Sequence, residues 1–573
     1  MTRRPADINY TFNNEELAAL SAYGTVRRHD AGEILVEPGQ SQVDCLITLS
    51  GETHAFIEGA DGPQRLGFME RGQFIGDLGT LTGQTALART VMGVAGEVLH
   101  IPFEKLQKLL VEQSALSDIF VNTFSARRAF ARQREVGAIV IIGAPYDRRV
   151  FSIRDFLNRH SLPHTWLDPD TDPLAAQLMT AKELSASDLP AVLLGVDPVL
   201  RKPGVDEIAA RLGLDLLPDG ASADVIVVGA GPAGLAASVY AASEGLTVLT
   251  LDSEGPGGQA GTSSKIENYL GFPMGLSGRE LADRAALQAQ KFGVRMAAPV
   301  CAAGLERLED GAYCLHVKDG RGLKAKAVVV ATGAQYRRLP IQGLESFEGR
   351  GVYYGASPLE AQLCTGSQAT IVGAGNSAGQ GAVFLAKSAQ DVHVLYRRKD
   401  IRDTMSEYLV RRLEETPNIH LHPQTSIEAM HGAEGATPDN QRLTALTLKN
   451  PDGSTRLETP FVFLFIGAAP FTDWLPKDLA RDEKGFVRTG AQLETLDLVR
   501  AGWREDRLPS PFETNLPRIY AVGDVRSGSV KRVASSVGEG SVVVSDIHKA
   551  ISELVNQGES DNSDNGVQTS STA

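Results

Sequence analysis

Two short glycine-rich segments carry the clearest chemical signature of the chain. Residues 225–235 read VIVVGAGPAGL and residues 369–379 read ATIVGAGNSAG, so each run of β-branched residues ends in closely spaced glycines. An Ala-rich helical stretch follows each run, which gives the order strand, tight turn and helix that binds a dinucleotide pyrophosphate at a helix N-terminus. One such match is weak evidence, but two in one chain predict two dinucleotides and electron transfer between them.

The glycines of the first segment have separate roles. Gly229 allows the tight turn, Gly231 lets the backbone approach the pyrophosphate, and Gly234 lets the helix pack close to the strand. A second strand over 246–251 ends in Asp252, about 20 residues beyond the glycines, where a carboxylate binds ribose hydroxyl groups. This pattern favours an adenosine ribose without a 2′-phosphate, as in FAD or NAD.

Basic residues follow the second segment instead. Its next strand, over 392–395, ends in Tyr396-Arg397-Arg398, and Arg402 follows. Because a guanidinium binds phosphate through paired hydrogen bonds, the cluster favours a 2′-phosphate, although the same arginines also suit a solvated helix start. We therefore predict that the first segment binds FAD and the second binds NADPH.

Further motifs agree with a known family. Residues 328–334 read VVVATGA, residues 519–525 read IYAVGDV, and residues 255–272 contain Gly257-Gly258-Gln259 and IENYLGF. With these motifs, residues 222–555 resemble a low-molecular-weight thioredoxin reductase in motif order and spacing.

The resemblance implies two sets of cofactor-binding residues and a homodimer. For FAD these are Gly229, Gly231, Gly234, Asp252, Gly258, Gln259, Asn268, Gly523 and Asp524. For NADPH they are Gly373, Gly375, Asn376, Ser377, Arg397, Arg398 and Arg402. It also implies that a last helix, within 532–545, directs its N-terminus at the flavin, where its dipole stabilises negative charge.

The chain departs from this family between its two glycine-rich segments. Thioredoxin reductases carry a Cys-x-x-Cys pair there, whereas the counterpart here is Gly355-Ala356-Ser357-Pro358. The four cysteines, Cys45, Cys301, Cys314 and Cys364, are not spaced as a redox pair. Thiol–disulfide exchange through an internal dithiol needs two thiols that can form a disulfide. We therefore predict that electrons do not pass from the flavin to thioredoxin through a disulfide of this chain. Cys364 is the one candidate catalytic thiol, and we interpret it as a packing residue.

The N-terminal residues 1–130 have a different pattern. Short strand-like runs alternate with glycine turns, and a helical stretch follows from Phe103 to about Arg128, which predicts a β-roll closed by a helix. The segment resembles a cyclic-nucleotide-binding domain. The resemblance rests on Gly32, Glu33, Pro38-Gly39, Gly51 and the cassette FIGDLGTLTGQTALARTV at 74–91.

The cassette departs from that family at its ligand-binding positions. Asp77 stands where the family has a glutamate for the ribose, and Leu87 stands where it has an arginine for the cyclic phosphate. Arg89 follows two residues later and lies on the same face of a strand, so it could substitute for the missing arginine. Its guanidinium would be displaced from the phosphate position. Because losing a charge-assisted phosphate contact is costly, we predict weak or absent cyclic-nucleotide binding.

Residues 136–217 resemble a glutaredoxin-like thioredoxin fold. Their predicted order is strand, helix, strand, helix, strand and closing helix, and the resemblance implies a cis peptide bond before Pro190. The family's Cys-x-x-Cys loop falls on residues 144–148, which lack cysteine. We interpret this segment as a docking or scaffold domain.

Composition limits the partners. The 573 residues have a net charge of −14, which disfavours nonspecific nucleic-acid binding. No apolar run approaches a membrane span, and the N-terminus lacks the apolar segment of a secretory signal. Few cysteines fit a reducing cytoplasm. We predict a cytoplasmic protein with no membrane partner and no metal site.

The predicted fold class is α/β, with two three-layer dinucleotide-binding domains preceded by a β-roll and a thioredoxin-fold domain. After 1–130 and 136–217, the predicted parts are 222–339 (FAD, first part), 340–456 (NADPH), 457–555 (FAD, second part) and a disordered tail, 556–573.

The predicted function is an FAD-dependent oxidoreductase that takes hydride from NADPH. Its acceptor stays open between an external disulfide reached through another thiol, a small redox protein such as ferredoxin or flavodoxin, a quinone and oxygen. The alternative of another class is a redox or cyclic-nucleotide sensor that contains a flavoprotein module.

Overall fold

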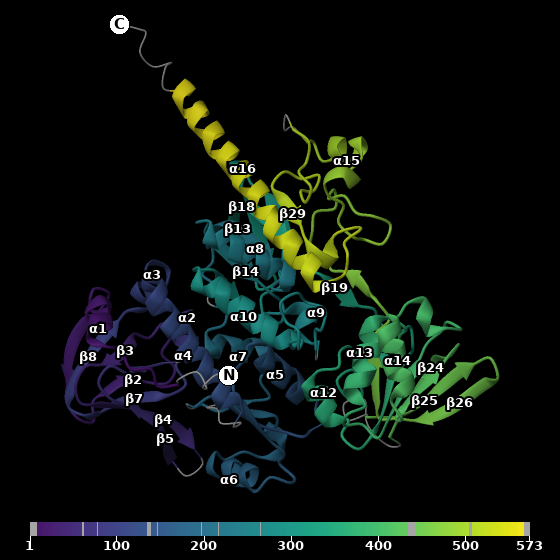
Figure 1. Ribbon diagram of the computed structural model, residues 1–573, viewed down its shortest axis with the longest axis horizontal. Coiled ribbons are helices and arrows are strands. Elements are labelled where there is room, and N and C mark those ends of the chain that lie inside the picture. The colour runs from purple at the N-terminus through teal and green to yellow at the C-terminus, as the bar shows by residue number, and fades with distance from the viewer. Residues whose placement is uncertain are drawn as a thin grey trace. The chain divides into compact units, whose positions relative to one another are not determined.

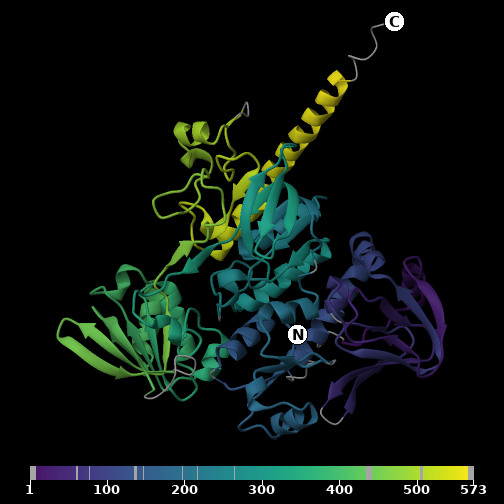
Figure 2. The same ribbon diagram turned by 180° about the vertical axis from the view of Figure 1, so that it is seen from behind.

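The computed structural model describes residues 8–59, 62–76, 78–133, 139–145, 147–195, 198–215, 217–263, 265–433, 442–503 and 507–565. The chain divides into two compact units, which Figures 1 and 2 show from opposite sides. The first unit comprises Met1–Leu216 and Arg338–Ile466, and the second comprises Leu217–Arg337 and Gly467–Ala573. The chain thus passes from the first unit to the second and returns once before it ends in the second.

The first unit begins with the predicted β-roll. Its two four-stranded sheets have the orders β1-β8-β3-β6 and β2-β7-β4-β5. The strands are β1 (Thr25–His29), β2 (Ile34–Val36), β3 (Cys45–Thr48), β4 (Glu52–Gly59), β5 (Gly62–Met69), β6 (Phe74–Ile75), β7 (Arg89–Val94) and β8 (Gly96–Ile101). The helices are α1 (Asn14–Ser21), α2 (Leu78–Thr82), α3 (Phe103–Glu112) and α4 (Ser114–Gln133). The closing helix begins at Phe103 as predicted, but it is divided at Gln113 into α3 and α4.

The thioredoxin-fold segment follows in the same unit. Its sheet has the order β10-β9-β11-β12, with β10 parallel and β11 antiparallel to β9. The elements are β9 (Ile139–Ile142), α5 (Arg148–Arg159), β10 (His164–Leu167), α6 (Pro173–Ala181), β11 (Ala191–Leu193), β12 (Leu200–Arg201) and α7 (Val205–Leu212). The Leu189–Pro190 peptide bond is cis, as the resemblance implied.

The third part of the first unit contains the second glycine-rich segment. Its parallel sheet has the order β20-β27-β21-β22-β23, and an antiparallel sheet, β24-β25-β26, packs on it through a shared apolar core. The strands are β20 (Val352–Tyr353), β21 (Gln368–Val372), β22 (Asp391–Leu395), β23 (Ile419–His422), β24 (Ser426–Gly432), β25 (Leu443–Asn450), β26 (Gly453–Glu458) and β27 (Phe461–Leu464). The helices include α11 (Leu344–Phe347), α12 (Pro358–Leu363), α13 (Asn376–Leu385) and α14 (Glu407–Glu415).

The second unit contains the first glycine-rich segment. Its main sheet has the order β15-β14-β13-β18-β17-β16, and β29 pairs with β18. The strands are β13 (Ser222–Val228), β14 (Val248–Leu251), β15 (Arg295–Ala297), β16 (Ala302–Arg307), β17 (Tyr313–Val317), β18 (Gly322–Val330) and β29 (Ile519–Ala521), with a separate pair, β19 (Ala334–Tyr336) and β28 (Ala468–Pro470). The helices include α8 (Pro232–Ser243), α9 (Gly258–Gly261), α10 (Gly278–Lys291), α15 (Thr495–Arg500) and α16 (Val533–Asn565). One face of the sheet and helices α8 and α16 share an apolar core.

Two predicted boundaries need correction. β27 pairs with β20 and β21, so residues 461–464 belong to the sheet of the first unit and not to the domain predicted from 457. Helix α16 continues through 556–565, part of the segment predicted to be disordered, because a helix already nucleated by packing extends at little cost. Residues 566–573 lie outside the described residues. Within the described ranges, no helix has both the length and the apolar character needed to cross a membrane.

Candidate cofactor sites

The first glycine-rich turn joins β13 to α8 in the second unit. Gly229 has a φ of +111°, and a Cβ there would lie 2.3 Å from the Ala331 carbonyl oxygen. A Cβ on Gly234 would lie 1.8 Å from the Gly229 oxygen, so the helix approaches the turn more closely than any side chain permits. A Cβ on Gly231, by contrast, would meet nothing nearer than the Gly258 Cα at 3.9 Å. The turn is therefore closely packed at Gly229 and Gly234 and open at Gly231. An open backbone at the N-terminus of α8 fits a pyrophosphate.

Asp252 follows β14 and lies against this turn. Its Oδ2 accepts a hydrogen bond from the Ala230 N–H at 2.7 Å, and its Oδ1 accepts from the Glu254 and Gly255 N–H groups at 2.9 Å each. The carboxylate is thus held in place by backbone donors. Because an ionised carboxylate has about four acceptor positions, it retains capacity for ribose hydroxyl groups.

Asp524 follows β29 in the same unit, and its neighbours are fixed by a partly buried glutamate, Glu539. The Gly523 N–H donates to Glu539 Oε2 at 2.7 Å, and Arg526 forms an ion pair with Glu539 at 2.6 Å. Burial raises the pKa of the Asp524 carboxyl, which makes no side-chain hydrogen bond to the described residues. A half-buried carboxylate without a protein donor fits a ligand that carries hydroxyl groups, such as the ribityl chain of a flavin.

The remaining predicted FAD residues lie on and after α9. A Cβ on Gly258, which has a φ of +52°, would come within 3.1 Å of the Gly231 Cα, so these two glycines bring their backbones together. The Gln259 amide donates to the Ala334 carbonyl oxygen. Asn268 is exposed. The structure therefore gathers the glycines and both aspartates around one end of the sheet, whereas Asn268 stays a prediction from resemblance.

The second glycine-rich turn joins β21 to α13 in the first unit. A Cβ on Gly373, whose φ is +153°, would lie 2.4 Å from the Phe465 oxygen, whereas a Cβ on Gly375 would meet nothing within 4 Å. The Asn376 Oδ1 accepts a hydrogen bond from the Ser406 N–H at 2.8 Å, and Ser377 is exposed in the first turn of α13. This arrangement repeats that of the first turn and fits a second pyrophosphate.

The three predicted phosphate-binding arginines differ in their partners. Arg402 donates two hydrogen bonds to Glu414 at 2.7 and 2.9 Å, which raise its pKa, and Arg398 lies 3.5 Å from Asp403. Arg397 is exposed and forms no ion pair with any described residue. The geometry therefore favours Arg397 as the phosphate ligand and weakens the prediction for Arg402, because its Nη2 already donates to both Glu414 oxygens and its other nitrogens lie 3.6–3.7 Å from Glu407 and Asp400.

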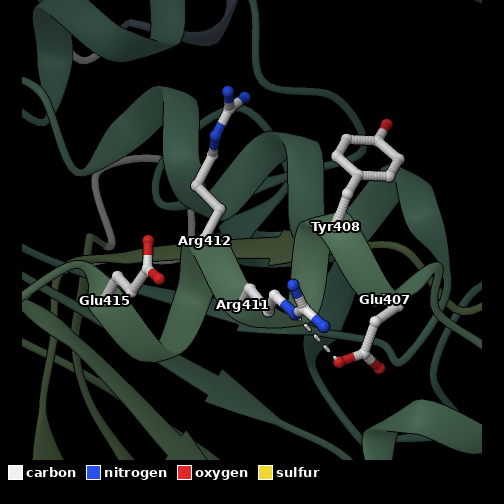
Figure 3. A pocket seen from close by; sticks show the side chains of 5 residues that line it. All are labelled: Glu407, Tyr408, Arg411, Arg412 and Glu415. Carbon is white, nitrogen blue, oxygen red and sulfur yellow. Dashed lines mark hydrogen bonds and ion pairs between the residues drawn. The ribbon is translucent and has the colours of Figure 1, made fainter.

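A shallow hollow lies close to these residues but has a different character. Its lining comes from one exposed face of α14, and Arg411 and Glu407 pair across it at 3.3 Å, as Figure 3 shows. The lining residues are Glu407, Tyr408, Arg411, Arg412 and Glu415. Alternating charges one turn apart are typical of a solvated helix surface, so we assign no cofactor to this hollow.

The segment that replaces the family's dithiol forms a capped helix. Ser357 caps α12 and exchanges hydrogen bonds with Glu360, whose Oε2 accepts from the Ser357 N–H at 2.9 Å. Glu360 is 7% exposed, and burial raises the pKa of its carboxyl to about 7. Cys364 ends this helix fully buried, and burial also raises the pKa of its thiol. Since a thiolate is the reactive form, these observations support Cys364 as a packing residue.

The thioredoxin-fold segment contacts this part of the same unit. The Phe151 ring on α5 lies 5.3 Å from the Tyr353 ring on β20, and Phe151 packs on the core that contains Cys364. Helix α5 directly follows the loop that lacks the second expected cysteine pair. These contacts support the interpretation of the thioredoxin-fold segment as a scaffold.

The raised pKa of Glu360 predicts a pH-dependent stability. Between the ordinary value of 4.5 and about 7, the folded state binds the proton that the unfolded state releases, so stability falls as pH rises and then levels off. The shift corresponds to roughly 3 kcal/mol. We expect Glu360→Gln, which keeps the shape and stays neutral, to be more stable than the unmodified chain at pH 8 and equal to it near pH 4.5, as measured by thermal unfolding. The exposed Glu345→Gln in the same unit is the control, and an unchanged profile in Glu360→Gln would contradict the assignment.

The cyclic-nucleotide cassette shows the departures that the sequence indicated. Leu87 packs against the apolar core of the thioredoxin-fold segment, so its position supplies no charge. Arg89 forms an ion pair with Glu37 at 2.9 Å, which neutralises the arginine expected to substitute. Asp77 lies outside the described residues. Position 87 therefore supplies no charge, and the arginine at position 89 is already paired with a carboxylate.

We expect calorimetry with cyclic AMP to show no saturable binding up to about 100 μM, because a phosphate without a charged partner loses most of its binding energy. Glu37→Gln removes one negative charge beside Arg89 and is expected to improve cyclic AMP binding measurably. Micromolar affinity in the unmodified chain would show that another group binds the phosphate.

Comparisons with known proteins show which families the chain is similar to. Residues 26–113 match the cyclic nucleotide-binding domain family. The chain is 28% identical over 332 residues to thioredoxin reductase of Bacillus subtilis, covering 58% of this chain and 95% of the relative. It is 30% identical over 322 residues to that of Treponema pallidum, covering 56% and 94%. The crystal structure of Lactococcus lactis thioredoxin reductase aligns at 26% identity and a TM-score of 0.49, covering 58% of this chain and 99% of that one.

The family itself is established by a longer match. The sequence profile of the pyridine nucleotide-disulphide oxidoreductases matches residues 223–540. This range is more than half of the 573 residues and contains both glycine-rich turns, Asp252 and Asp524. The chain therefore belongs to the pyridine nucleotide-disulphide oxidoreductase family.

Proposed function

We propose that the chain is an FAD-dependent oxidoreductase that takes hydride from NADPH and delivers electrons without a dithiol of its own. The observation that carries the second half of this proposal is the stretch Gly355–Pro358, the counterpart of the thioredoxin reductase Cys-x-x-Cys pair, which has no cysteine and leads into the capped helix α12. The first half is supported by two open glycine turns, by Asp252 and Asp524 near one of them, and by Arg397 near the other.

The residues have distinct tasks in this proposal. FAD, when bound, supplies the hydride acceptor and the electron carrier. The turn at Gly231 binds its pyrophosphate, Asp252 orients the adenosine ribose, and Asp524 binds the ribityl chain. The N-terminus of α16, which begins at Val533, stabilises negative charge on the reduced ring through its dipole. The turn at Gly375 binds the pyrophosphate of NADPH.

The acceptor must then take electrons at the flavin. An external disulfide, ferredoxin or flavodoxin, a quinone and oxygen all remain open, because none of them needs a second thiol in this chain. The relatives named thioredoxin reductase favour a disulfide or a small redox protein, but the chain lacks the pair through which such an acceptor is usually reached.

Anaerobic stopped-flow on the purified full chain tests the proposal. The protein should be yellow, release FAD on denaturation, and lose its flavin absorbance when mixed with NADPH. A panel of acceptors should then restore the absorbance. A preparation without flavin bands that added FAD does not rescue would overturn the proposal, and tight NADPH binding with negligible turnover would support a sensor instead.

Arg397 should determine the preference for NADPH. We expect Arg397→Ala to raise the Michaelis constant for NADPH by roughly 10- to 100-fold, because a charge-assisted phosphate contact contributes about 1.5–3 kcal/mol. The turnover number should change little, since the 2′-phosphate is remote from the hydride and contributes uniform binding. Arg402→Ala, whose guanidinium is bound to Glu414, is the matched control and should change the constant much less. Equal use of NADH and NADPH by the unmodified chain would contradict this assignment.

A further inference from the structure

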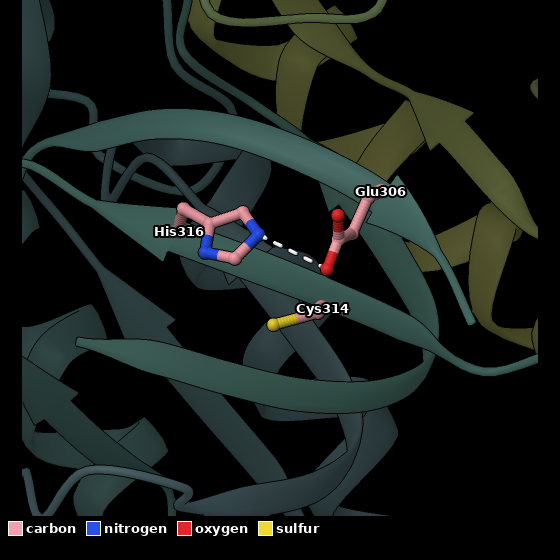
Figure 4. Close-up of side chains that lie close together, drawn as sticks. All are labelled: Glu306, Cys314 and His316. Carbon is pink, nitrogen blue, oxygen red and sulfur yellow. Dashed lines mark ion pairs between the residues drawn. The ribbon is translucent and has the colours of Figure 1, made fainter. Parts of the chain in front are cut away.

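A group of three potential metal ligands lies in the second unit, on strands β16 and β17. Cys314 and His316 are two residues apart on β17 and therefore share one face of the sheet. Glu306 on β16 is the direct register partner of Cys314. Their ligand atoms, a carboxylate oxygen, a sulfur and an imidazole nitrogen, all lie within 4.8 Å of one another. Figure 4 shows the three side chains together on the two neighbouring strands.

Glycines keep the space around these ligands open. His316 is paired in register with Gly304 on β16 and with Gly322 on β18, so neither neighbouring strand places a side chain beside the imidazole. A Cβ on Gly322 would lie only 3.2 Å from the Cys314 sulfur. Any side chain at position 322 would crowd the Cys314 sulfur. Because Gly322 has none, space for an ion remains beside the sulfur.

The distance between two of the three ligand atoms is close to that in a tetrahedral zinc site. The His316 Nε2 lies 3.3 Å from the Glu306 Oε1. Zinc bonds of about 2.0–2.2 Å to nitrogen and oxygen place two such ligands roughly 3.4 Å apart in a tetrahedron. The side chains of His316 and Glu306 are 45% and 57% exposed, so an ion can reach them from solvent. We propose that Glu306, Cys314 and His316 form a three-ligand site for Zn²⁺ whose fourth position is taken by water.

The donor set favours zinc over the hard cations. Magnesium and calcium bind oxygen ligands, whereas zinc accepts thiolate, imidazole and carboxylate together. Binding forms a bond from zinc to the Cys314 sulfur, and the thiol proton leaves to solvent, so no electron is transferred. Charges also balance, because one thiolate and one carboxylate offset the two charges of the ion. Lys324, the register partner of Cys314 on β18, is the positive group that opposes binding.

The site is independent of the proposed redox function and is tested with the full chain. After metal is removed by a chelator, titration with ZnCl₂ followed by calorimetry should show one ion bound per chain at this site. X-ray absorption at the zinc edge should show one sulfur at about 2.3 Å together with nitrogen and oxygen ligands at about 2.0–2.2 Å. A spectrum without sulfur would overturn the proposal.

Variants separate this site from adventitious binding. Cys314→Ser and Glu306→Gln each change a direct ligand of the ion. Each should weaken zinc binding by at least about tenfold, because even residues that only hydrogen-bond to a metal ligand commonly change the affinity by that much. Lys324→Gln should strengthen it, a gain that misfolding cannot imitate. The matched control is His54→Gln, because His54 and Glu52 form a similar pair at 3.2 Å without a cysteine. Binding that is equal in the unmodified chain and in Cys314→Ser, with circular dichroism showing both folded, would also overturn the proposal.

Discussion

A chain that carries Gly234→Ala is expected to purify without flavin. The added methyl group would lie 1.8 Å from the Gly229 carbonyl oxygen and 3.2 Å from the Ala331 side chain, so α8 must move away from the turn. That movement displaces the N–H groups at the start of α8 from the position where they bind a pyrophosphate. We expect the ratio of flavin to protein to fall by at least about tenfold, which requires the dissociation constant for FAD to rise by more than tenfold, a loss of more than roughly 1.4 kcal/mol of binding. Absorbance of the purified chain, before and after addition of FAD, measures the ratio.

Gly538→Ala is the matched control for this experiment. Gly538 lies in α16 of the same unit, and a Cβ there would meet nothing within 4 Å. Because alanine is favoured over glycine within helices by about 0.5–1 kcal/mol, this variant should keep its flavin and be slightly more stable. Full flavin content in Gly234→Ala would show that the turn is not the pyrophosphate site.

The strand–turn–helix units could be predicted because their determinants are local. The spacing of Gly229, Gly231 and Gly234 states directly where the chain turns and where a helix approaches it, and the structure has α8 begin at Pro232. The β-roll and the thioredoxin-fold segment were predicted for the same reason, since their strands and turns alternate along the sequence. Local patterns of this kind need no knowledge of distant residues.

Features that depend on distant residues could not be predicted. Glu414 lies on α14, twelve positions beyond Arg402. Nothing in the sequence spacing indicates that its carboxylate accepts hydrogen bonds from the Arg402 guanidinium. Glu539 fixes the Gly523 backbone from α16, again without a sequence signal. The apolar run of β27 suits either dinucleotide domain, so its pairing decides the boundary. Glu360 differs, because the sequence Ser-Pro-Leu-Glu at 357–360 is a capping box that could have been recognised.

Removal of all four cysteines is expected to leave the first half-reaction intact. A chain in which Cys45, Cys301, Cys314 and Cys364 are replaced by alanine should reduce its flavin with NADPH at the unmodified rate, because hydride passes to the flavin without a thiol. Neither this chain nor the unmodified one should reduce thioredoxin through a dithiol of its own. Stopped-flow absorbance measures the first step, and a coupled disulfide assay measures the second. A slower flavin reduction in a variant that is shown to be folded would contradict the expectation.

The single variant Cys364→Ala decides between the two possible routes for electrons. Cys364 is fully buried, burial raises the pKa of its thiol, and no other cysteine follows it at redox-pair spacing. A thiol of this kind is a poor nucleophile, so turnover with any disulfide acceptor should persist when it is removed. Loss of that turnover with normal flavin reduction would make Cys364 a redox residue and our packing interpretation wrong. Persistent turnover would mean that electrons leave at the flavin, so that the acceptor is selected by access to the flavin ring and not by exchange with a thiol.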